Sequence, residues 1–67
     1  MQNMAKLIDA WGRAELAKDL GVPKERVRGW RRHDVLPPKY WKRLLEKAPA
    51  RNIKISPDLL IDIAARD

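Results

Sequence analysis

The chain contains no cysteine and only one histidine among its 67 residues. Without cysteine it has no disulfide, no thiolate ligand for zinc and no cysteine nucleophile, which suits a reducing compartment. His33 alone cannot form a metal cluster. The carboxylates are scattered over helical surface positions and form no obvious acid–base pair. We therefore expect no enzyme, no cofactor and no metal site.

Long apolar runs are also missing. No segment approaches the ~20 consecutive apolar residues of a membrane-spanning helix, and the start, MQNMAKLIDAWG, lacks the cationic residues and apolar stretch of a secretory signal. These absences predict a cytoplasmic protein with no membrane partner. A chain of this length buries only ~60% of its unfolded surface, so we expect one domain, residues 1–67, with a modest core.

Positive charge is abundant and is confined to one stretch. Residues 24–43 contain eight basic and two acidic side chains, whereas seven bases balance seven acids in the rest of the chain. The whole net charge of +6 therefore lies in the middle of the sequence. Such a cluster favours a nucleic acid, an anionic membrane surface or an acidic protein as the partner.

The first half of the chain shows helical periodicity. Residues 4–11 have apolar side chains at helical spacing, with Asn3 placed to cap the helix and Gly12 to end it. A second helix is expected over residues 13–20, and Gly21 suits the left-handed conformation that closes a helix.

The third and fourth helices are expected to start at prolines. A proline in the first turn loses no hydrogen bond, so a third helix is predicted from about Pro23 to Arg32 and a fourth from Pro38 to Ala48. The three tryptophans lie on apolar stripes, and we expect them in the core.

The last part of the chain contains an extended segment and a fifth helix. Residues 50–56, ARNIKIS, alternate apolar and polar side chains and predict an extended connection or a very short strand. Ser56 and Pro57 then begin a C-terminal helix of about residues 57–65. The fold class is thus all-α, a small domain of four to five helices.

The central helices have the spacing of a helix-turn-helix. Ala17 lies four residues before Gly21, and Val27 and Trp30 would pack the second helix of the pair onto the first. Over residues 13–32 the chain resembles the lambda-repressor-like DNA-binding domains of the phage Cro/repressor superfamily. The extension GWRRHDVLPPKYWKRLLE is similar to that of small Cro-like regulators of phage origin.

The resemblance implies a transcriptional regulator, usually a repressor, that occupies an operator as a homodimer. Its partner would be double-stranded DNA with an inverted repeat, and its location the nucleoid. Arg13 stands where many relatives have a glutamine that contacts phosphate, and Pro23 stands where many have a serine or threonine cap.

Helix geometry indicates which side chains would contact DNA. With Val27 and Trp30 in the core, the opposite face of the third helix is the one that would enter the major groove, and arginine there can bind guanine bidentately. Arg28 and Arg32 are the principal candidates for base contacts. The predicted DNA-binding residues are Arg13, Lys24, Glu25, Arg26, Arg28, Gly29, Arg31, Arg32, Lys39 and Tyr40.

Several alternatives remain open at this stage. Glu25 is either a cytosine acceptor or a helix-capping acid, and Gly29 either allows close approach to DNA or is merely tolerated. The apolar residues of the last segment are either a dimer interface or part of a monomer core; they are Ile53, Ile55, Leu59, Leu60 and Ile63. Competing functions are a protein-interaction adaptor or anti-repressor, and non-specific DNA binding.

Overall fold

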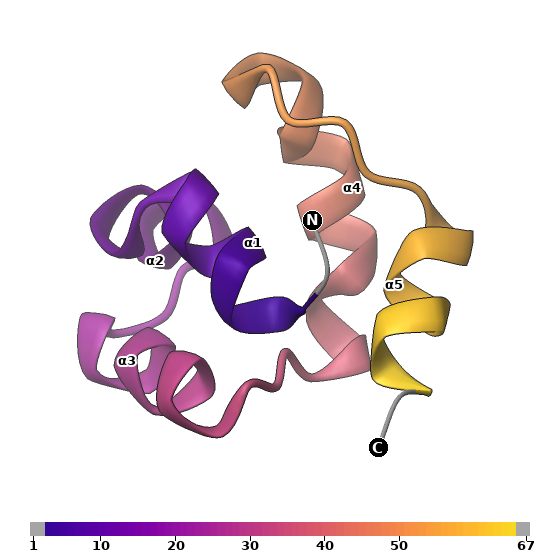
Figure 1. Ribbon diagram of the computed structural model, residues 1–67. Helices are drawn as coiled ribbons and strands as arrows, with labels where there is room; N and C mark the ends of the chain where they lie inside the picture. The colour runs from indigo at the N-terminus through magenta and orange to yellow at the C-terminus, as the bar shows by residue number, and fades with distance from the viewer. Residues whose placement is uncertain (1–2, 66–67) are drawn as a thin grey trace.

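The computed structural model describes residues 3–65, which form five α-helices, two short 3-10 helices and no strand (Figure 1). The α-helices are α1 (Met4–Trp11), α2 (Arg13–Leu20), α3 (Lys24–His33), α4 (Trp41–Lys47) and α5 (Pro57–Ala64), and the 3-10 helices are η1 (Pro38–Tyr40) and η2 (Ala48–Arg51). The predicted all-α class is confirmed for these residues. None of the described helices combines the length and the apolar character that crossing a membrane requires.

Helix α1 begins and ends at the predicted residues. The side-chain oxygen of Asn3 accepts a hydrogen bond from the backbone N–H of Lys6 at 2.7 Å, which satisfies one of the donors left free at a helix start. Gly12 ends the helix at φ 93°, a conformation that side chains disfavour. Because Gly12 turns the chain sharply, α2 starts at the next residue.

A tight turn connects α2 to α3. Gly21 is left-handed at φ 68°, and the backbone N–H of Val22 donates to the carbonyl of Ala17 at 3.0 Å. Pro23 lies at the cap, in an extended conformation, and α3 starts one residue later than predicted and ends at His33 rather than Arg32. Both of these shifts are single residues.

Asp34 closes α3 and links it to α1. It is left-handed at φ 56°, and its carboxylate Oδ1 accepts a hydrogen bond from the backbone N–H of Ala5 at 2.8 Å. This contact satisfies a free donor in the first turn of α1 and places a negative charge near the positive end of that helix. One side chain therefore fixes the end of α3 against the start of α1.

The predicted fourth helix is divided into three parts. Pro38 starts the 3-10 turn η1, α4 follows from Trp41, and Ala48 and Pro49 belong to a second 3-10 turn, η2. Residues 53–56 form an extended connection without a strand. Helix α5 starts at Pro57, where Ser56 Oγ accepts from the backbone N–H of Leu59 at 3.1 Å, as the sequence predicts.

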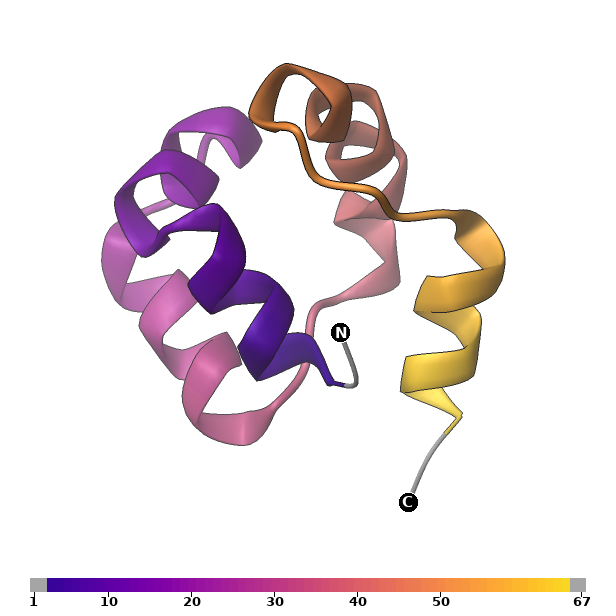
Figure 2. The same cartoon turned by 45° about the horizontal axis from the view of Figure 1, so that its top comes forward.

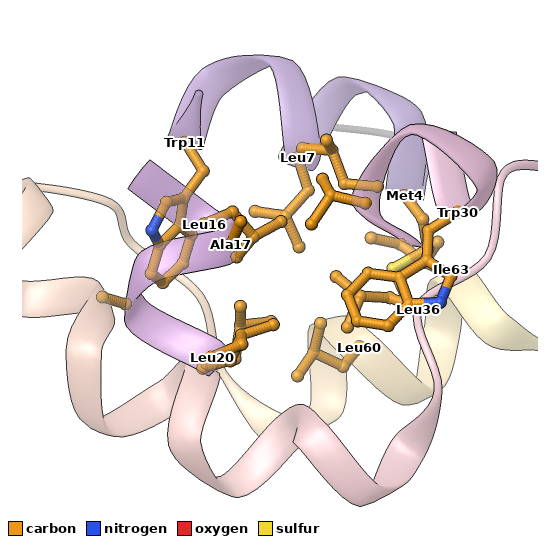
Figure 3. Packing of buried hydrophobic residues seen from close by; sticks show 14 residues of the cluster. Met4, Leu7, Trp11, Leu16, Ala17, Leu20, Trp30, Leu36, Leu60 and Ile63 are labelled. Carbon is orange, nitrogen blue, oxygen red and sulfur yellow. The ribbon is translucent and has the colours of Figure 1, made fainter. Parts of the chain in front are cut away.

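A single apolar core joins all the helices. Helices α1, α2 and α3 lie on one side of the molecule and α4 and α5 on the other in both views (Figures 1 and 2). The buried side chains of the two halves converge between them (Figure 3). The core residues include Met4, Leu7, Ile8, Trp11, Leu16, Leu20, Val27, Trp30, Leu36, Leu44, Leu60 and Ile63.

Candidate nucleic-acid interface

Helix α3 has one buried side and one free side. Val27 and Trp30 are buried, and α3 packs against both α1 and α2 through this side. In both views α3 lies at the margin of the molecule (Figures 1 and 2). Successive side chains are rotated by about 100° around a helix. The residues on the side opposite Val27 and Trp30 therefore point away from the protein.

The outward side of α3 is strongly cationic. Arg28 and Arg32 are exposed on the face opposite the core, with Glu25 beside them, and Lys24 and Arg26 are exposed on the two flanks. Within residues 3–65 these four cations form no ion pair. They are therefore available to a negatively charged partner. The Glu25 side chain is exposed and forms no hydrogen bond or ion pair within residues 3–65, so no capping contact is present there.

Arg31 differs from the other arginines of α3 because it is already paired. Its Nε and Nη2 donate to Oδ1 and Oδ2 of Asp9 in α1, at 2.6 and 3.0 Å. This bidentate hydrogen bonding lowers the pKa of the Asp9 carboxyl below its usual value. The sequence grouped Arg31 with the DNA-binding residues, whereas here it holds α3 to α1.

Arg13 lies where the starts of α2 and α3 come together. It lines a shallow surface hollow of about 320 Å³ with Lys24 and Arg28, so that three cations from two helices surround one concave site. Ala14 and Glu15 complete the lining, and the Glu15 carboxylate lies close to Gly12 at the start of α2. Three cations against the one carboxylate of Glu15 leave this hollow with a positive charge, so it attracts anionic groups.

A second basic area lies on η1 and α4. The ring of Tyr40 is half-buried against that of Trp30, with centroids 5.1 Å apart, and this contact fixes η1 beside α3. The Lys39 ammonium lies 5.2 Å from the centre of the Tyr40 ring. Lys42 and Arg43 line the same surface hollow as Lys39 and Tyr40, next to the end of α2. Tyr40 thus has a packing role whatever else it contacts.

Gly29 lies in the interior of α3 with ordinary helical geometry. A Cβ atom built on it has no neighbouring atom within 4 Å, so packing does not require a glycine there. Glycine in a helix interior costs ~1 kcal/mol relative to alanine. The fold therefore offers no reason for this residue.

Two of the predicted interface residues belong to the core of a single chain. Leu60 and Ile63 are buried within the chain, and a partner cannot reach them while α5 stays in place. Ile53, Ile55 and Leu59 are half-buried and pack against the core. For Leu60 and Ile63 the structure therefore supports the monomer-core interpretation, because the domain needs α5 to cover α4.

Asp19 forms a polar contact that the sequence did not predict. The Trp11 indole N–H donates to Asp19 Oδ2 at 2.9 Å, and Arg51 donates to both carboxylate oxygens at 3.0 Å. The Arg51 hydrogen bonds, helped by the one from Trp11, lower the pKa of Asp19 against the opposing effect of desolvation. Trp11 precedes Asp19 by eight residues and lies in another helix, and Arg51 follows it by 32, so no local pattern links the three.

Comparison of the chain with protein-family models, curated proteins and solved structures found no match.

Proposed function

We propose that this protein is a sequence-specific double-stranded DNA-binding regulator of the helix-turn-helix type. In this proposal α2 and α3 are the two helices of the motif, and α3 enters the major groove. The observation that carries the proposal is the exposed, unpaired cationic side of α3, which lies opposite the buried Val27 and Trp30. A helix of ten residues is about 15 Å long, and the major groove of B-DNA admits a helix.

The neighbouring charges support the same orientation. Arg13 at the start of α2 lies beside Lys24 at the start of α3, and Lys39 lies on η1 next to Tyr40. In the bound complex these residues contact phosphates and set the position of the protein, while Arg28 and Arg32 reach the base edges. The protein then acts at the nucleoid by occupying an operator, most simply to repress transcription.

One small module makes few base contacts, so we propose that two copies of the chain bind an inverted repeat together. The half-sites would lie about one helical turn apart. With Leu60 and Ile63 used in the core, the two copies meet through other residues or through the DNA itself.

The test is the selection of bound fragments from random duplex DNA at ~0.15 M salt, followed by sequencing. We expect an enriched inverted repeat. Arg28→Ala or Arg32→Ala should each remove about 1–3 kcal/mol of discrimination at one base position. The matched control is Lys54→Ala, which removes an exposed cation outside residues 24–43 and should leave the preference unchanged.

Two other results would overturn the proposal. Weak binding without enrichment, lost as salt rises, would indicate a non-specific DNA-binding protein. No DNA binding at all would indicate an adaptor whose basic side meets an acidic protein.

A further inference from the structure

Gly29 makes a gap in the outer surface of α3, and this gap is surrounded by long side chains. One turn away along the helix lie Glu25 and Arg26 on one side and Arg32 and His33 on the other, all of them exposed. Apart from the neighbouring residues and the backbone of α3 itself, no atom lies within 4 Å of the position that a Cβ atom on Gly29 would occupy. The backbone of α3 is therefore reachable from outside at this one point of its cationic side.

The requirements of the fold leave this glycine unexplained. Gly12 and Gly21 have positive φ angles and are needed for turns, whereas Gly29 is helical. No side chain packs onto it, so it does not permit a close contact within the molecule. A glycine that serves neither a turn nor an internal contact is suited to the approach of another molecule.

We infer that Gly29 is a positioning residue that sets how deeply α3 enters the major groove. This inference rests on the proposed DNA-binding function. Gly29 lies on the side of α3 opposite the core, between the two predicted base-reading arginines, so the group that approaches it is a base edge rather than a phosphate. A side chain at this position holds the helix away from the bases and moves Arg28 and Arg32 out of bonding distance.

The experiment compares the native protein with Gly29→Ala and Gly29→Leu on the selected DNA site. For Gly29→Ala we expect a Tm about 4–8 °C higher, because alanine favours the helix and meets no neighbour. Its affinity for the selected site should fall by about tenfold, the effect of one unfavourable base contact, and Gly29→Leu should lose more. A gain in stability with a loss of binding excludes misfolding as the cause.

The matched control is Ala50→Leu. Ala50 is exposed on η2, which lies far from α3 in both views (Figures 1 and 2), so the added side chain should leave affinity unchanged. Equal affinities of the native protein, Gly29→Ala and Gly29→Leu would overturn the inference and leave the DNA-binding proposal intact. Failure of the native protein to select any DNA would instead contradict the proposed function itself.

Discussion

Two arginines one helical turn apart on α3 have different electrostatic roles. Arg28 is exposed and without an acidic partner in the described part of the chain, whereas Arg31 donates two hydrogen bonds to Asp9. The Arg31–Asp9 pair has no net charge and attracts a phosphate weakly. The number of cations on a helix therefore overstates the number that can release counterions from DNA.

Removing the Asp9 charge should free Arg31 for DNA. We expect Asp9→Asn to tighten DNA binding and to make the plot of log affinity against log salt steeper by about 0.9, the value for one additional phosphate contact on duplex DNA. Filter-binding or fluorescence titrations at four or five salt concentrations measure both quantities.

Asp58→Asn is the matched control for Asp9→Asn. It removes one carboxylate from α5, on the other side of the molecule from α3, and should leave the salt slope unchanged (Figure 1). If Arg31 already contacts phosphate in the native protein, Asp9→Asn would not make the salt slope steeper. In that case Arg31→Ala alone, with Asp9 intact, would make the slope shallower by about 0.9.

At the scale of elements, Asp19 connects three parts of the chain. It lies in α2, accepts a hydrogen bond from Trp11 in α1, and pairs with Arg51 in η2. The pKa of Asp19 is lowered in the folded protein, so the folded state binds a proton less readily than the unfolded chain. The stability from this contact is complete above the unfolded pKa of about 3.9 and is lost as the pH falls through the folded pKa.

Asp19→Asn should consequently destabilise the protein at neutral pH and matter much less in acid. At pH 7 we expect a loss of about 1.5–3 kcal/mol, the range for a hydrogen bond to a charged group, measured by urea unfolding. As the pH falls below the unfolded pKa of about 3.9, the difference in stability between the native protein and the variant should shrink steadily. Glu46→Gln is the control, since Glu46 is exposed and forms no ion pair in residues 3–65. An effect of Asp19→Asn that is independent of pH would contradict this account.

The sequence predicted the helices well because their signals are local. Asn3, Gly12, Gly21 and Ser56 act on the backbone within a few residues of themselves, and each lies where it was expected. The division of the fourth helix was not predicted, because Pro38 and Pro49 are compatible with either kind of helical turn.

The candidate site was only partly predictable for a related reason. The periodicity of α3 identified its outward face, since burial of Val27 and Trp30 fixes the rotation of the helix. It could not show that Arg31 would meet Asp9, 22 positions earlier, or that Asp34 would bind the start of α1. Contacts between distant segments depend on how the helices pack, and this packing cannot be predicted from any short stretch of sequence.

In the molecule as a whole, one apolar core extends from α3, whose outward side is cationic, to α5. Helix α5 contributes Leu60 and Ile63 to the same cluster as Val27 and Trp30, so the last helix helps to hold the site in shape. On the outside of α5 the exposed large apolar residue is Ile61, which is 57% accessible. Leu60 faces the core and Ile61 faces outward, so substitutions at these two positions test the core role and the interface role of α5 separately.

Substitution of these neighbours tests which role α5 has. Leu60→Ala should lower the free energy of unfolding by about 2–5 kcal/mol at every protein concentration, because the cavity forms inside one chain. Ile61→Ala should change it by less than about 0.5 kcal/mol, as for most surface positions. Thermal unfolding at protein concentrations spanning two orders of magnitude measures both. A native Tm that rises with concentration, with a rise that Ile61→Ala abolishes, would instead show that the outer face of α5 joins two copies, since only association makes stability depend on concentration.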